Sequence, residues 1–170
     1  NRQDMPVWPA IDRSLYECVQ TMERLQHWID RAFAARLVAV DTETSSLDAM
    51  RAQLAGISLA LGPGDACYIP LAHGGTDMFA EKPAQVDRAE ALALLKPLLE
   101  SDAVLKIGLN AKFDINVLAR HGVHVAPIDD AMLISFCLDA GLDTLPGGGA
   151  TRFRSPFSTP WAACGFSVTG

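Results

Sequence analysis

The sequence has 170 residues, of which 49% are hydrophobic and 20% charged, and this length and apolar content predict one globular domain with a sizeable core. Its net charge of −6 argues against binding of nucleic acid through a broad basic surface, because that mode requires clustered Lys and Arg. The sequence has no apolar run of membrane-spanning length, no leader-like start and 4 cysteines without a C-x-x-C pair, so we expect a cytoplasmic protein with reduced thiols and no membrane contact.

The first half of the chain predicts a helix followed by three strands. Residues 1–20 show little periodicity and are expected to form an irregular lead-in. Apolar residues then recur at helical spacing from Thr21 to Phe33. Three short apolar runs predict strands: 37–41, 54–61 and 67–71. The segment Gly62-Pro63-Gly64-Asp65 has the composition of a hairpin turn, so the three strands are expected to be adjacent and antiparallel.

The second half predicts more helix than strand. Asp87-Arg-Ala-Glu90 has the spacing of a capping box before a helix that Pro97 is expected to kink or shorten. The remaining elements are predicted as a strand and two helices: 104–107, 111–120, and 129–137 with Asp129 as its N-cap. This order predicts an α/β domain with a mixed sheet and helices on both faces, and no regular element is predicted after Asp143.

Two pairs of polar residues follow predicted strands. Asp41 and Glu43 are two apart in an extended segment, so their carboxylates share one side and favour a site for a hard divalent cation such as Mg²⁺. The alternative is a solvated strand end whose acids serve only the loop. Asn110 and Asp114 are four apart at the start of a helix, where Asn110 could cap the helix and Asp114 could enter a cleft. The alternative for Asp114 is an acid that only favours the positive helix end.

Four ordered segments resemble the 3′→5′ proofreading exonuclease domains of bacterial DNA polymerase I, members of the DEDD superfamily. Val-Ala-Val-Asp41-Thr-Glu43 resembles the first exonuclease motif, and Asn110-Ala-Lys-Phe113-Asp114 resembles the second. The other two segments are Cys67-Tyr-Ile-Pro-Leu-Ala-His73 and Asp130-Ala-Met-Leu-Ile-Ser-Phe136, both similar to segments of the polymerase I domains. The resemblance extends over about residues 16–142, and we assign the incomplete domain to residues 21–142 and a divergent tail to 143–170.

The resemblance implies a ribonuclease H-like fold with strand order 3-2-1-4-5. It implies hydrolysis of the 3′-terminal phosphodiester of single-stranded DNA with two Mg²⁺ or Mn²⁺ ions. Asp41 would bridge both ions, Glu43 would serve the nucleophile side, and Asp114 the leaving-group side. Four further residues match positions at the site of the DNA 3′ end, with Leu47 as the wedge against terminal bases: Thr44, Leu47, Asn110 and Phe113.

The third motif of this superfamily, Tyr-x-x-x-Asp, is not found, because no tyrosine follows Tyr68. His124 and Asp129 have the spacing of its variant form, but Pro127 lies between them where a helix is required. Three functions therefore compete. The first is a DNA exonuclease domain beside a polymerase domain, impaired in this chain. The second is an inactive module that binds single-stranded DNA or supports a polymerase, and the third is a ribonuclease D-like RNA exonuclease, which the Tyr68 segment disfavours.

Overall fold

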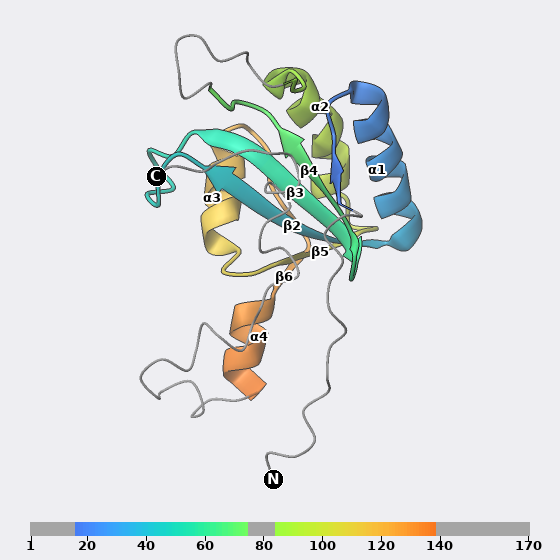
Figure 1. Cartoon of the computed structure of the whole chain (residues 1–170). Helices are drawn as coiled ribbons and strands as arrows, with labels where there is room; N and C mark the ends of the chain where they lie inside the picture. The colour runs from blue at the N-terminus through green and yellow to red at the C-terminus, as the bar shows by residue number, and fades with distance from the viewer. Residues whose placement is uncertain (1–15, 75–83, 139–170) are drawn as a thin grey trace.

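The computed structural model describes residues 16–74 and 84–138, and its centre is a single mixed sheet (Figure 1). In chain order the strands are β1 (Glu17–Cys18), β2 (Leu37–Thr44), β3 (Leu54–Gly62), β4 (Asp65–Pro70), β5 (Leu105–Gly108) and β6 (Ile128–Asp130). They lie in the order β1-β4-β3-β2-β5-β6. Strand β3 is antiparallel to β2 and β4, whereas the pairs β1–β4, β2–β5 and β5–β6 are parallel. The expected α/β class is confirmed. The five neighbouring strands β4-β3-β2-β5-β6 have the expected 3-2-1-4-5 order.

The hairpin between β3 and β4 forms where the sequence predicts it. Gly62 pairs with Asp65, and Gly64 has a φ of 75°, a left-handed conformation that glycine adopts without steric cost. Because the two strands are so closely connected, every residue of β4 has a fixed partner on β3. This fixed register positions the side chains discussed below.

Four helices accompany the sheet: α1 (Met22–Ala35), α2 (Arg88–Leu99), α3 (Lys112–Ala119) and α4 (Ala131–Leu138). Thr21 caps α1 by accepting from the backbone of Arg24, and Asp87 caps α2 by accepting from Ala89 and Glu90, as the capping box predicts. Pro97 was expected to kink or shorten α2, and it lies inside the helix, which continues to Leu99. The proline therefore does not end the helix.

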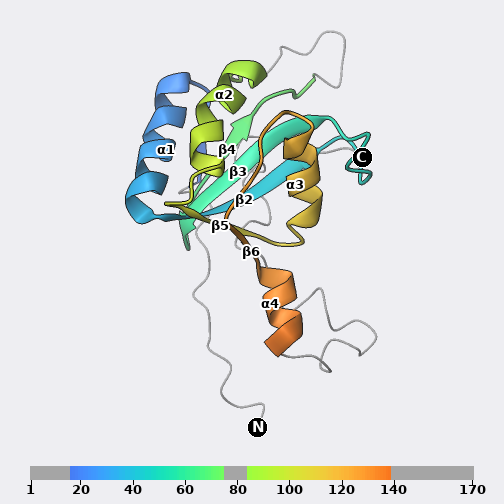
Figure 2. The ribbon, with the colours of Figure 1, turned by 180° about the vertical axis from the view of Figure 1, so that it is seen from behind.

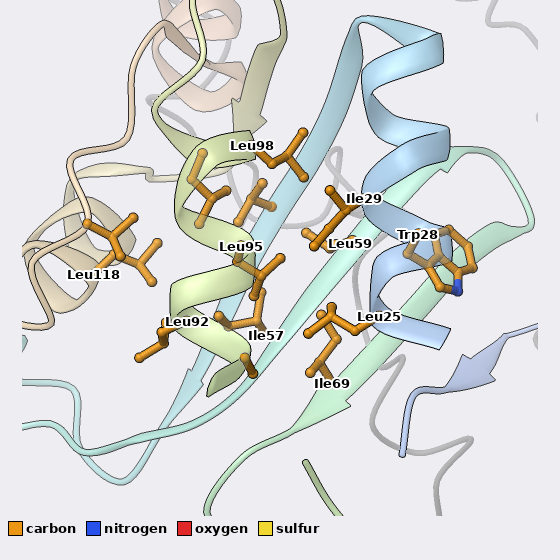
Figure 3. Close-up of a cluster of buried hydrophobic side chains, with 14 of the residues drawn as sticks. Leu25, Trp28, Ile29, Ile57, Leu59, Ile69, Leu92, Leu95, Leu98 and Leu118 are labelled. Carbon is orange, nitrogen blue, oxygen red and sulfur yellow. The ribbon is translucent and has the colours of Figure 1, made fainter. Parts of the chain in front are cut away.

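The main core lies on one face of the sheet. Side chains of α1 and α2 meet those of β3 and β4 there, and Leu118 of α3 extends the same core (Figure 3). Figures 1 and 2 show α1 and α2 side by side over the sheet from opposite directions. In β2, Val38 and Val40 are buried in this core, while Ala39 between them is only half-buried. Alternate residues of β2 therefore face away from the core.

The second face carries smaller and more polar side chains. Its small buried cluster consists of Tyr16, Ala60 and Ala66, packed against Ala39. Helices were expected on both faces of the sheet. Within the described ranges, no helix residue belongs to this small cluster. Helix α4 extends away from the sheet (Figures 1 and 2). Alanines and carboxylates offer little apolar surface for a helix to bury.

Two strands were not predicted individually. β1 lies in the segment expected to be irregular, and β6 lies where the N-terminus of the last helix was expected. Both are very short, so local sequence carries almost no strand signal, and their conformation is determined by pairing with β4 and β5. The prediction for residues 143–170 lies outside the described residues.

Lys106 of β5 is a buried cation surrounded by backbone carbonyl groups. Its side chain is fully buried, and its Nζ donates to the carbonyl oxygens of Ser101, Val104 and Ala126 at 2.8, 2.8 and 2.6 Å. One ammonium group thus satisfies carbonyls before β5 and before β6. Burial lowers the pKa of Lys106, and the three hydrogen bonds offset the loss of hydration.

We expect Lys106→Met to lower the free energy of unfolding by about 1–3 kcal/mol, because methionine retains the apolar stem but leaves three carbonyls without their donor. Urea unfolding followed by circular dichroism measures the change. Lys112→Met removes an exposed ammonium on α3 and serves as the matched control. Equal stability of the two variants would contradict a structural role for Lys106.

Candidate metal-binding and active site

The two acids of the first motif lie on the face of β2 opposite the core. Thr42, between them, is buried on the same side as Val38 and Val40, and Asp41 and Glu43 alternate with it. Across β3, Asp41 is paired with Ser58 and Glu43 with Gly56. Both carboxylates therefore project over a part of the sheet where the neighbouring side chains are small.

Asp114 reaches β2 where the neighbouring strand has ended. The pairing between β2 and β5 ends at Ala39 and Ile107, before the acids begin. Beyond that point, the Oδ1 atom of Asp114 accepts from the Thr42 backbone N–H at 3.0 Å and from the Thr42 Oγ1 hydroxyl at 2.5 Å. Asp114 is itself buried, with 6% of its surface exposed. The second-motif acid is thus bonded to the residue between the two first-motif acids.

Burial and the charge of Asp114 raise the pKa values of both first-motif acids. Burial, followed by the charges of Asp114 and Glu43, raises the pKa of Asp41 from 3.8 to about 7. Burial and the charge of Asp114 raise the pKa of Glu43. The pKa of Asp114 is also raised, chiefly by burial and further by the charge of Asp130, although both bonds from Thr42 oppose the change. Acids whose pKa values are raised by burial and by neighbouring charges are typical of a functional site.

The chemistry of these donors fits a hard divalent cation, because they are carboxylate oxygens whose repulsion a cation would relieve. Their spacing is wider than the sequence analysis expected. Among residues 16–74 and 84–138, no three Asp, Glu, His or Cys side chains gather closely enough to hold one metal ion. The physical reason is that like charges separate, and Asp114 takes two hydrogen bonds from Thr42 instead.

Asp130 connects two helix N-termini. Its carboxylate accepts from the backbone N–H groups of Asn110 and Ala111 at 3.0 and 2.8 Å, and from those of Met132 and Leu133 at 2.9 and 3.4 Å. The expected cap residues are therefore corrected at both helices. Asp130 rather than Asp129 caps α4, and no side chain of residue 110 caps α3. A single carboxylate satisfies both sets of N–H groups because β6 brings it beside them.

The backbone of Asn110 has a structural role. It has a φ of 59°, in the left-handed region that asparagine tolerates better than most residues. This conformation turns the chain from β5 into α3. The exposed Asp129 lies in strand β6 and not in a helix, which argues against the variant third motif with His124.

The remaining residues proposed for the DNA end have different environments. Leu47 is 98% exposed on the loop after β2, whereas Phe113 is half-buried and packs against the main core. The hydroxyl of Thr44 donates to the Ser46 carbonyl at 3.0 Å, so this side chain orders the loop that carries Leu47.

Sequence reasoning missed two residues that organise the site. Thr42 was given no role, although a polar residue in the core-facing series of Val38 and Val40 signals a specific partner. Arg120 was interpreted as either a phosphate contact or an ordinary solvated charge. Its Nη1 atom donates to the carbonyls of Ala49 and Ala52 at 2.9 and 2.7 Å and thereby connects the end of α3 to the loop after β2. No local pattern could have identified that long-range contact.

The chain matches known proteins over most of its length. The 3′-5′ exonuclease family matches residues 16–145. The chain is 43% identical over 143 residues to DNA polymerase I of Rhizobium leguminosarum, covering 76% of this chain and 14% of that protein. It is 40% identical over 140 residues to DNA polymerase I of Pseudomonas aeruginosa, covering 81% of this chain and 15% of that protein. The chain therefore corresponds to a small part of these polymerases.

A solved structure shows the same fold. The crystal structure of Escherichia coli RNase D, an exoribonuclease involved in structured RNA processing, aligns with a TM-score of 0.53 and 20% identity, covering 77% of this chain and 30% of that one. At this level of identity the likeness concerns the fold alone.

Replacing Asp41 by Asn should stabilise the protein in chelator, increasingly as the pH rises from about 4 to about 7. The folded-state pKa of Asp41, about 7, lies above its ordinary 3.8. The protonated Asp41 carboxyl therefore contributes its full stability below the lower pKa, and this stability is lost as the pH rises through the upper pKa. The expected gain at pH 8 is on the order of 1–3 kcal/mol in urea unfolding. Asp30→Asn, an exposed change on α1, is the control, and a gain independent of pH would contradict the assignment.

Proposed function

Because the chain belongs to the 3′-5′ exonuclease family, we propose that it is the proofreading exonuclease part of a DNA polymerase I and acts on the 3′ end of single-stranded DNA. The observation that carries this proposal is the arrangement of Asp41, Glu43 and Asp114, in which the buried carboxylate of Asp114 on α3 raises the pKa values of the two half-buried carboxylates on β2. Without a counter-charge these neighbouring carboxylates destabilise the fold, which favours binding of a cation at this place.

The three acids would hold divalent metal ions. Two Mg²⁺ or Mn²⁺ ions would supply a hydroxide near neutral pH and stabilise the charge on the leaving 3′ oxygen. Asp41 would serve both ions. Glu43 lies further along β2 and would serve the nucleophile side, while Asp114 would serve the leaving-group side. The hydrogen bonds from Thr42 keep Asp114 beside β2 and use only its Oδ1 atom.

The DNA end would lie over the loop after β2 and the start of α3. Leu47 is a fully exposed apolar side chain on a loop that Thr44 and Arg120 hold in place, which suits a wedge against the terminal bases. Phe113 and Asn110, at the start of α3, would line the same site. Contact with base faces tolerates any sequence, as removal of a mismatched nucleotide requires.

Two other functions remain as alternatives. A module that only binds single-stranded DNA or supports a polymerase is favoured by the lack of a tyrosine after Tyr68, since the third motif would supply a further acid and a tyrosine that orients water. An RNA exonuclease is supported only by the fold shared with RNase D at 20% identity. The identities of 40% and 43% to DNA polymerase I favour DNA.

A polymerase domain is the proposed partner. The match covers only 14% and 15% of the length of the two DNA polymerase I relatives, so most of each relative lies outside the matched segment. We propose a cytoplasmic location. None of the helices in the described ranges combines the length and the apolar character needed to cross a bilayer.

We expect the chain to bind single-stranded DNA weakly, only with a divalent metal, and with little sequence preference. A net charge of −6 repels phosphates, so cations and base stacking must provide the attraction. Fluorescence anisotropy with labelled homopolymer and mixed oligonucleotides, in Mn²⁺ and in chelator, measures this. Tight binding in chelator would contradict the proposal, as would a strong preference for one sequence.

We expect the polypeptide of residues 1–170 to show little nuclease activity and a version extended by a Tyr-x-x-x-Asp segment to be at least roughly a hundredfold faster, because metal catalysis depends on closely held geometry. The assay compares both on matched DNA and RNA oligonucleotides, with Asp41→Ala as the inactive control. Equal rates that Asp41→Ala abolishes would show that another acid of this chain completes the site. Degradation of RNA alone would favour the ribonuclease alternative.

A further inference from the structure

The segment 67–73, which the proposed function leaves without a role, places a tyrosine on the acid face of the sheet. Tyr68 is fully buried on β4, and its register partner on β3 is Ser58, which in turn is paired with Asp41. The three residues form one row across the sheet. Paired residues of antiparallel strands share a face, so Tyr68 lies on the same side as the acids.

The Tyr68 hydroxyl occupies the side-chain position of a neighbouring glycine. A Cβ atom added at Gly56 would lie 2.0 Å from the Tyr68 hydroxyl oxygen and 2.3 Å from its Cζ atom. Gly56 therefore has no room for a side chain, and the phenol fills that room. The absence of a Cβ at residue 56 is what allows Tyr68 to lie across β3.

Gly56 is the residue directly opposite Glu43. Cβ positions of directly opposed residues lie about 4.5–5.5 Å apart, and the Tyr68 hydroxyl oxygen is 2.0 Å from the Cβ position of residue 56, so this oxygen is on the order of 3–7 Å from the Cβ of Glu43. At such a separation one water molecule can connect the Tyr68 hydroxyl and the Glu43 carboxylate.

His73 holds the hydroxyl in place. Its Nε2 atom is hydrogen-bonded to the Tyr68 hydroxyl, and the two rings meet edge to face with centroids 5.6 Å apart. The backbone of His73 is fixed in turn, because its N–H donates to Gln85 Oε1 at 2.9 Å and its carbonyl accepts from Gln85 Nε2 at 3.3 Å. When His73 carries a proton on Nε2, the phenol oxygen accepts from it and the phenol hydrogen can point toward a carboxylate, which only accepts when ionised.

We propose that Tyr68 is a positioning residue for Glu43: its hydroxyl, fixed by His73, donates toward the Glu43 carboxylate and orients it for the metal. This inference deepens the proposed function and rests on it. Side chains that orient a metal ligand through a hydrogen bond change metal affinity or activity by about 10–100-fold when they are removed. Tyr68 acts through Glu43 and needs no contact with DNA.

The test measures Mn²⁺ affinity of the 170-residue chain by water-proton relaxation, so it does not depend on turnover. Tyr68→Phe should weaken binding about tenfold. Tyr16→Phe removes the hydroxyl of the other tyrosine of the chain, from the small cluster on the same face, and should leave the affinity unchanged. Glu43→Gln should also weaken binding. The double variant Tyr68→Phe/Glu43→Gln should bind no more weakly than Glu43→Gln, because Tyr68 then has no carboxylate to orient.

His73 provides a second and independent test. His73→Gln retains an N–H donor for the phenol and should preserve most of the affinity, whereas His73→Phe should lower it as Tyr68→Phe does. Thermal unfolding of each variant identifies any that have lost the fold. If Tyr68→Phe is unfolded, the comparison of His73→Gln with His73→Phe decides whether the Tyr68 hydroxyl affects Mn²⁺ affinity.

Two results overturn the inference and can be distinguished. If Tyr68→Phe binds Mn²⁺ with the same affinity as Tyr16→Phe, Tyr68 does not act through Glu43, although the metal site itself is retained. The same conclusion follows if the loss of affinity caused by Tyr68→Phe adds fully to the loss caused by Glu43→Gln. If Asp41→Ala leaves Mn²⁺ binding of the parent chain unchanged, the metal site itself is misassigned, and the role of Tyr68 is overturned together with the proposed function.

Discussion

The early end of β5 is the constraint on which the acid site depends. Pairing with β2 stops at Ala39, so the next part of β2 has no strand on that side. The backbone N–H of Thr42 is satisfied instead by a side chain, Asp114, which arrives with α3. Because the carboxylate of Asp114 takes the place of a neighbouring strand here, an acid from a distant segment lies beside Asp41 and Glu43. A longer β5 would complete the sheet and exclude that acid.

The two faces of the sheet have opposite effects on stability. On one face, buried aliphatic side chains of α1, α2 and β3 form the main core and supply most of the favourable burial. On the other, carboxylates are held partly out of water and near one another, which disfavours their charged forms. Such an arrangement persists because the first face stabilises the whole domain. Proteins commonly give up stability in this way where they bind or react.

The sequence predicted most of the regular elements because they have local signals, whereas the short strands β1 and β6 have almost none. Apolar periodicity marked α1 and α2, and Pro63-Gly64 marked the hairpin. The order of acidic motifs and the segment at Tyr68 indicated the family that the matches over residues 16–145 show. What local patterns could not supply were contacts between distant segments. The bonds of Asp114 to Thr42, Asp130 to Asn110 and Arg120 to Ala52 each join residues that only the folded sheet brings together.

The left-handed conformation of Asn110 affects how mutations of the second motif should be interpreted. With a φ of 59°, this residue sets the direction in which α3 leaves β5, and α3 carries Asp114. An alanine at position 110 removes a side-chain amide and also strains the backbone, so lost activity would not by itself identify a contact with DNA. A glycine removes the amide while keeping the turn accessible. The difference between the two substitutions, and not either alone, separates what this residue binds from how it bends the chain.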